Sequence, residues 1–116
     1  MLSGGMDSSS VVAIAKELLK NDGSDLLHTF SAIAPEPETC IETRTIHSAL
    51  TMNGLCAHTA NYDHLDTFLP KLGELSWQLD EPFDNHMTLP RVAYLLAHQH
   101  DINVVMDGID GDTALA

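Results

Sequence analysis

The segment Ser3-Gly4-Gly5-Met6-Asp7-Ser8-Ser9-Ser10 constrains the fold of this chain more than any other. It follows two strand-type residues, Met1-Leu2, and a helical pattern begins within it at Ser8. Glycine adopts positive φ and lets the backbone approach a ligand closely. The first N–H groups of a helix are unpaired and attract phosphate. Residues 3–10 therefore predict a strand, a phosphate-binding turn and a helix in succession.

Asp7 places a negative charge in this predicted anion site. A Mg²⁺ ion shared between Asp7 and phosphate oxygens resolves the conflict. The turn is not of the Walker A type, because no Gly-Lys-Ser/Thr follows it. The segment favours a site for the pyrophosphate part of ATP. A serine-capped turn without a ligand is the alternative.

The spacing of apolar residues predicts helices alternating with strands around this turn. Strands are expected at 26–33, 55–60 and 102–106, and loops at 35–38 and 80–88. Two helices are expected at 8–20 and from 38 or 39 to 53. A third is expected to begin at a cap at Asp63 and to kink or break at Pro70, and a fourth to begin at a cap at Thr88, with Pro90 near its first turn. This alternation predicts the α/β class, with an open parallel sheet and flanking helices. Residues 1–116 are expected to form a single partial domain, truncated at both ends, because only Met1-Leu2 remain of the strand before the turn.

A second glycine-containing acidic segment, Asp107-Gly108-Ile109-Asp110-Gly111-Asp112-Thr113, follows the last predicted strand. Ligands of open parallel sheets bind outside the carboxyl ends of the strands, so this loop and the first turn are expected to face one pocket. Asp7 and Asp112 together would suit Mg²⁺, which prefers oxygen ligands. An acidic turn that merely ends a strand is the alternative.

The charge balance limits the classes of partner. The chain has 5 Lys and Arg against 17 Asp and Glu, for a formal net charge of −12. Nucleic acids and anionic membranes require basic surface and are disfavoured as partners. No stretch has transmembrane length, and the isolated Cys40 and Cys56 favour a reducing, cytoplasmic setting, although a disulfide stays open. The seven histidines show no zinc-type spacing and are expected to be structural.

Both motifs resemble those of the asparagine synthetase family, whose synthetase domain has an ATP-pyrophosphatase fold of the adenine nucleotide alpha hydrolase type. Ser3–Ser9 is similar to the family's pyrophosphate loop, SGGxDSS, and residues 104–112 resemble its later VxxSGEGxDE segment. Residues 27–31 resemble the family's second strand, and residues 79–83 with Leu89-Pro90 resemble a later loop. The first motif also occurs in other adenylating enzymes, such as GMP and NAD synthetases. The second motif narrows these families to that of asparagine synthetase.

The resemblance implies a reaction in two steps. A small-molecule or peptide carboxylate attacks the α-phosphate of ATP, which gives an acyl-adenylate and pyrophosphate, and an amine donor then displaces AMP to form an amide. Carried over position by position, the pyrophosphate would be held by Ser3, Gly4, Gly5, Asp7, Ser8 and Ser9. Adenine would be met by the backbone near Ser31 and Ala32 and, on the other side, by Gly108, and Mg²⁺ would be held by Asp7 and Asp112.

Departures from the family pattern leave the catalytic residue unknown. Ile109 stands where the family has a glutamate implicated in proton transfer, Asp110 is the neighbouring candidate, and Asp107 replaces a serine. No glutaminase domain is expected within residues 1–116, since neither Cys40 nor Cys56 is placed to be its nucleophile. Whether this chain alone is an enzyme stays open, and a homo-oligomer or a missing parent domain could complete it. The alternatives are macrolactam formation, as in lasso-peptide cyclases, and a nucleotide-binding module without catalysis.

Overall fold

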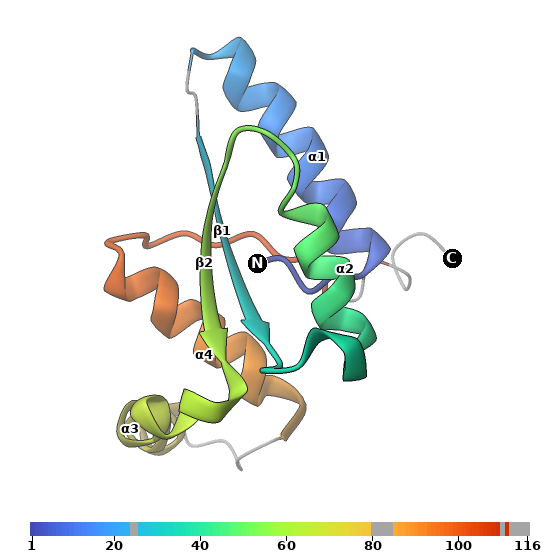
Figure 1. The fold of residues 1–116 in the computed structure, drawn as a ribbon. Helices are drawn as coiled ribbons and strands as arrows, with labels where there is room; N and C mark the ends of the chain where they lie inside the picture. The colour runs from blue at the N-terminus through green and yellow to red at the C-terminus, as the bar shows by residue number, and fades with distance from the viewer. Residues whose placement is uncertain (24–25, 80–84, 110, 112–116) are drawn as a thin grey trace.

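Two parallel strands, β1 (Leu27–Ile33) and β2 (Leu55–Asn61), form the centre of the molecule (Figure 1). In this computed structural model, which describes residues 1–23, 26–79, 85–109 and 111, the strands pair in register along their full length. The helices lie on both sides of the strands, so the predicted α/β class with parallel strands and flanking helices is confirmed at this level. Both strands agree with their predicted ranges to within one residue.

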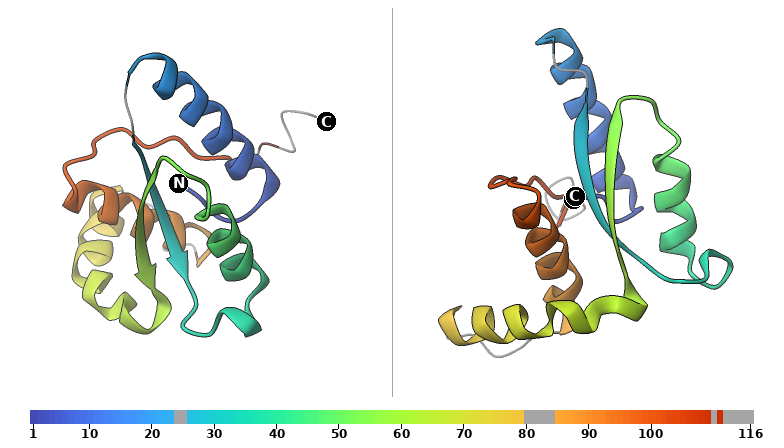
Figure 2. Two further views of the ribbon diagram at one scale, coloured as in Figure 1. Left: turned by 45° about the horizontal axis from the view of Figure 1, so that its top comes forward. Right: turned by 60° about the vertical axis from the view of Figure 1, so that its left-hand side comes forward.

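Helices α1 and α2 lie on one side of the strands and α4 on the other, with α3 beyond the carboxyl end of β2 (Figure 2). The helical segments are α1 (Met6–Asn21), the 3₁₀ turn η1 (Pro37–Thr39), α2 (Ile41–Ala49), the 3₁₀ segment η2 (Tyr62–Phe68), α3 (Leu69–Leu79) and α4 (Asn85–Gln99). The main core is enclosed between α4, α3 and the face of the sheet that carries Phe30 and Ala60. Val92 and Ala97 on α4 are fully buried there. This packing holds the carboxyl ends of both strands beside the first half of α4.

Several helix boundaries differ from the prediction. The loop predicted at 35–38 contains the start of η1, because Pro37 has a φ suited to the first helical position. Asn61 rather than Asp63 caps the third helical segment, and its side-chain oxygen accepts from the Asp63 N–H at 3.0 Å. Pro70 lies in the first turn of α3 and divides it from η2, as predicted.

Two further helices also start or stop elsewhere than the apolar spacing indicates. Helix α2 covers only Ile41–Ala49 of the predicted segment. Helix α4 begins at Asn85, before the predicted cap at Thr88, so Pro90 lies inside the helix. Most of the loop predicted at 80–88 lies outside the described residues.

Residues 102–106 do not form the buried strand that their apolar run predicts, and Val104 is 82% exposed. Met1 and Leu2 lie between this segment and β1. The Leu2 N–H donates to the Phe30 carbonyl at 2.9 Å, and the Met1 amino group donates to the Met106 carbonyl. Among the described residues the sheet contains β1 and β2 alone, so residues 102–106 lack the ladder of backbone hydrogen bonds that defines a strand.

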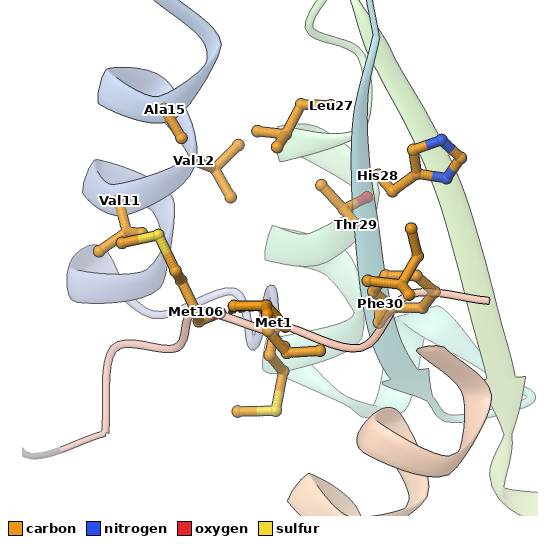
Figure 3. Close-up of a pocket in the computed structure, with 12 residues that line it drawn as sticks. Met1, Val11, Val12, Ala15, Leu27, His28, Thr29, Phe30 and Met106 are labelled. Carbon is orange, nitrogen blue, oxygen red and sulfur yellow. Dashed lines mark hydrogen bonds between the residues drawn. The ribbon is translucent and has the colours of Figure 1, made fainter. Parts of the chain in front are cut away.

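An apolar cavity of about 210 Å³ lies between β1, α1 and residues 102–106 (Figure 3). Val12 and Thr29 line its walls, and the side chains of Met1 and Met106 project at its edge. Burial lowers the pKa of the Met1 amino group at this edge, against the opposing effect of the Asp107 carboxylate. Within the described part of the chain, no helix is both long enough and apolar enough to cross a membrane.

Candidate functional site

The turn before α1 is shaped by two glycines with different roles. Gly4 has φ of +82°, which side chains rarely adopt, and a Cβ there would overlap Thr45 Oγ1 and lie 2.7 Å from the Glu42 carbonyl oxygen. Gly5 is the N-cap of α1, with φ of −73°, and supplies no side-chain cap. The turn is therefore packed tightly against the start of α2, while the N-terminus of α1 is not covered by a cap side chain.

The serine hydroxyls bind the turn to itself. Ser8 is 3% exposed. Its Oγ accepts from the Ser3 N–H at 3.2 Å, lies 3.0 Å from Ser3 Oγ and donates to the Gly5 carbonyl at 3.2 Å. Ser9 Oγ donates to the same carbonyl at 2.8 Å. These hydroxyls, expected to be phosphate donors, thus also fix the shape of the turn.

The second glycine-containing loop packs directly on Asp7. A Cβ on Gly108 would lie 2.7 Å from Ser8 N and 3.1 Å from Asp7 Cβ. A Cβ on Gly111 would lie 2.7 Å from Asp7 Cγ and 2.8 Å from its Oδ2. Only glycine permits such close approach. The two motifs, about a hundred residues apart in sequence, therefore meet at the first turn of α1, whereas Asp110 and Asp112 lie outside the described residues.

Asp107 stabilises the second loop from within. Its Oδ1 accepts from the Ile109 N–H at 3.1 Å, and its Oδ2 accepts from the Tyr94 hydroxyl of α4 at 2.5 Å. Burial, together with this hydrogen bond, raises the pKa of Tyr94 to about 12. The carboxylate that replaces a serine of the resembled motif thus links the loop to α4. Ile109 itself is 43% exposed and has no group that can transfer a proton.

A pocket of about 340 Å³ opens beside the first turn, at the carboxyl ends of the strands. Of the residues predicted to bind a nucleotide, Ser3 and Ala32 line it. Ser31 does not, because it is 1% exposed and its Oγ donates to the Leu2 carbonyl at 2.7 Å. The lining is completed by Met1, Leu2, Cys40, Glu42, Ile46, Tyr62, Leu89, Pro90 and Ala93.

The polar lining residues Cys40, Glu42 and Tyr62 were missed by the sequence reasoning. Cys40 Sγ donates to Glu42 Oε2 at 3.2 Å. Burial raises the pKa of Tyr62, and the nearby Cys40 and Glu42 raise it further. Only Tyr62 directly follows a strand end, whereas Cys40 and Glu42 lie at the start of α2, so no shared pattern in the sequence marks the three as neighbours. Cys40 is a free, half-buried thiol, as is Cys56.

These features define a parallel α/β protein with a glycine-rich turn at a helix N-terminus, on the edge of the sheet where such proteins bind ligands. The whole chain, residues 1–116, matches the model of the asparagine synthase family, and the chain belongs to that family. The resemblance of the two motifs is thereby confirmed, and ATP-dependent amidation is the chemistry of the family. Neither the curated proteins nor the solved structures contain a significant match.

Proposed function

We propose that the turn at residues 3–9 binds the pyrophosphate part of ATP, in a domain that activates a carboxylate as an acyl-adenylate and passes it to an amine. The observation that carries this proposal is the contact between the two motifs. Gly108 and Gly111 both approach Asp7 more closely than a side chain would allow, at the N-terminus of α1. Convergence of a helix start, a carboxylate and glycine backbone suits a nucleotide phosphate better than it suits a plain turn.

The donor set around the turn is compatible with a phosphate group. The N-cap residue of α1 is a glycine without a side-chain cap, and the exposed Ser3 and Gly5 flank the helix start. In a chain with a net charge of −12, backbone N–H groups must supply much of the attraction to a polyanion. Mg²⁺, which would be held by Asp7 with Asp112, would neutralise phosphate charge.

The neighbouring pocket is the proposed place for the rest of the nucleotide and the substrate. Its volume of about 340 Å³ falls within the roughly 300–1,000 Å³ usual for small-molecule sites. Ala32 on one side and the Gly108 backbone on the other would meet adenine. The family model and the parallel strands support an ATP-pyrophosphatase fold of the adenine nucleotide alpha hydrolase type, and the free thiols support a cytoplasmic location.

Release of pyrophosphate from ATP by the full-length protein tests the proposal. Asp7→Asn keeps the shape of the side chain but removes the charge, and is expected to reduce the release strongly. Asp22→Asn is the matched control, because Asp22 is exposed at the opposite end of α1. Equal release by wild type and Asp7→Asn would show that Asp7 does not act on the nucleotide.

A nucleotide-binding module without catalysis is the second candidate, and Ile109 is the observation that favours it. If this candidate is correct, the protein binds ATP but forms no AMP with any carboxylate and amine offered. Macrolactam formation remains the alternative among active forms. Its product is a peptide lighter by one water, with no external amine incorporated.

A further inference from the structure

A cluster of two imidazoles and one thiol lies on the sheet, away from the proposed nucleotide site. His28 on β1 is paired in register with Cys56 on β2, so both side chains emerge on the same face. His58 lies two residues after Cys56 and shares that face. His28 and Cys56 are the second residues of their strands and His58 is the central residue of β2, whereas the turn at residues 3–9 lies at the carboxyl ends. The separation from His28 to Ala32 along β1 is about 13 Å.

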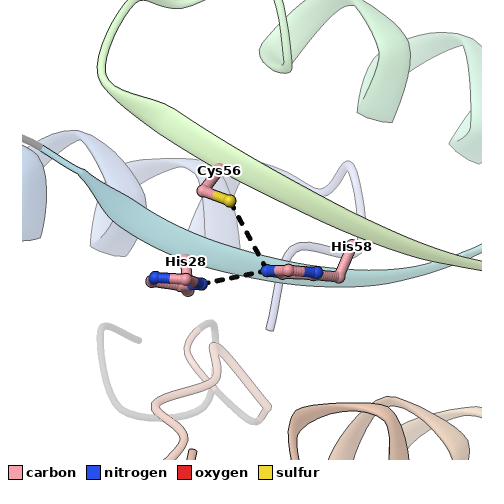
Figure 4. A group of neighbouring side chains, drawn as sticks. All are labelled: His28, Cys56 and His58. Atoms are coloured by element: carbon pink, nitrogen blue, oxygen red, sulfur yellow. Dashed lines mark hydrogen bonds between the residues drawn. The ribbon is translucent and has the colours of Figure 1, made fainter. Parts of the chain in front are cut away.

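The ligand atoms of these three side chains converge (Figure 4). His28 Nδ1 lies 2.9 Å from His58 Nε2, and Cys56 Sγ lies 3.6 Å from the same nitrogen. All three atoms lie within 4.8 Å of one another. His28 is exposed and the other two are half-buried, so the cluster is open to solvent on one side. Among the residues that the structure describes, this is the group of side chains placed to hold a metal ion together.

Two of the three separations, His28–His58 and Cys56–His58, are close to those required by tetrahedral zinc. Zinc bonds of about 2.0–2.1 Å to nitrogen and 2.3 Å to sulfur give ligand-to-ligand distances of about 3.3 Å for two nitrogens and 3.6 Å for nitrogen and sulfur. The Cys56–His58 distance already matches the second value. The two histidines need to separate by only a few tenths of an ångström, which small rotations of the exposed His28 can supply.

We propose that His28, Cys56 and His58 form a Zn²⁺ site with three protein ligands and a fourth position open to solvent. The ligands are His28 Nδ1, Cys56 Sγ and His58 Nε2. A thiolate with imidazoles is a donor set that selects zinc over Mg²⁺ or Ca²⁺, which prefer oxygen. When the ion binds, Cys56 loses its thiol proton to solvent and the ion displaces the His28–His58 hydrogen bond.

The surroundings of His58 favour metal binding. Its ring packs against Phe30, with centroids 4.9 Å apart, and against His100 after α4, with centroids 3.9 Å apart. These contacts hold the ring in place. The net charge of −12 raises the local concentration of divalent cations.

A bound ion would connect the two strands beside the end of α4. Because the ligands come together only when β1 and β2 pair, zinc would bind the folded chain and raise its melting temperature. This site is independent of the proposed nucleotide chemistry, since it uses none of the residues of the turn or the neighbouring pocket.

Competition for Zn²⁺ with a chromogenic chelator tests the site on the metal-stripped full chain. Wild type is expected to bind one zinc per chain, and His28→Gln and Cys56→Ser are each expected to weaken binding at least about tenfold. The matched controls are His47→Gln, at an exposed histidine of α2, and Cys40→Ser, at the other half-buried thiol. Both controls are expected to retain wild-type affinity.

Substitution with Co²⁺ identifies the thiolate directly. A sulfur-to-metal charge-transfer band is expected for wild type and Cys40→Ser and is expected to be absent from Cys56→Ser. His28 is exposed, so His28→Gln decides the question even if Cys56→Ser fails to fold, as circular dichroism would show. The proposal is overturned if wild type binds no zinc, if the charge-transfer band is missing, or if His28→Gln binds zinc as tightly as wild type.

Discussion

Replacement of Gly4 by alanine tests how the first turn is held against α2. The residue has φ of +82°, where an alanine costs about 1–2 kcal/mol. The new Cβ would also overlap Thr45 Oγ1 and lie 2.7 Å from the Glu42 carbonyl oxygen. The carbonyl is backbone and cannot rotate away, so the start of α2 must shift, at a further cost of about 1–3 kcal/mol. We expect a total loss of about 2–5 kcal/mol in the free energy of unfolding.

Two other glycines separate the two components of this loss. Gly23 has nearly the same φ, +80°, but a Cβ there meets nothing within 4 Å. Gly23→Ala therefore measures only the free-energy cost of placing an alanine at positive φ. Gly5 has an ordinary φ and a Cβ there would meet only Ser3 Oγ at 3.6 Å, so Gly5→Ala is expected to change stability little.

Urea denaturation followed by circular dichroism gives the three free energies. A double variant, Gly4→Ala with Thr45→Ala, is expected to be more stable than additivity predicts, because one of the overlapping atoms is gone. Equal losses for Gly4→Ala and Gly23→Ala would refute the argument, since they would show that the contact with α2 contributes nothing. An unchanged affinity for ATP in a folded Gly4→Ala protein would separately count against a role of the turn in nucleotide binding.

Three further variants test individual interactions. Ser31→Ala removes the buried hydrogen bond to the chain start and is expected to cost about 1–2 kcal/mol in urea denaturation; a loss near zero would contradict this. Asp101→Gly relieves a φ of 60° after α4 and is expected to stabilise by about 1 kcal/mol, whereas Asp22→Gly, at φ of −85°, is not; equal effects would contradict the strain argument. Burial and Asp107 raise the pKa of Tyr94 to about 12 in the folded protein, above its ordinary value of about 10. The protonated Tyr94 therefore stabilises the fold fully below about pH 10, and this stabilisation is lost as the pH rises towards 12. An absorbance titration of tyrosinate should lose the step near pH 12 in Tyr94→Phe, and a Tyr94 midpoint near 10 would show that burial and Asp107 do not raise its pKa.

The local elements of the fold were predictable because short-range rules govern them. The ranges of β1, β2 and α1 follow from apolar spacing, and the break at Pro70 follows from the missing N–H of proline. The expected strand at 102–106 was wrong for a reason that lies outside the segment. An apolar run becomes a strand only when a neighbouring strand pairs with it, and within the described residues the sheet consists of β1 and β2 alone.

The candidate site was predictable only in part. The two glycine-containing motifs could be found because each consists of residues that are adjacent in the sequence. The sequence could not assign Cys40, Glu42 and Tyr62 to the pocket, because they come from separate segments and follow no regular spacing along the chain. The Ser31 hydroxyl donates to the Leu2 carbonyl, a contact between segments that no local pattern predicts, and the expected contact of the backbone near Ser31 with adenine stays a prediction.

The sequence by itself determined the class of fold, the family and the glycine-rich turn before α1, because glycine φ values and helix periodicity act over a few residues. The tertiary structure alone decided which distant residues became neighbours. Gly108 and Gly111 reach Asp7 because their loop packs on the first turn of α1. His28 meets Cys56 and His58 because the register of two parallel strands sets them side by side, and no spacing along the chain encodes that register.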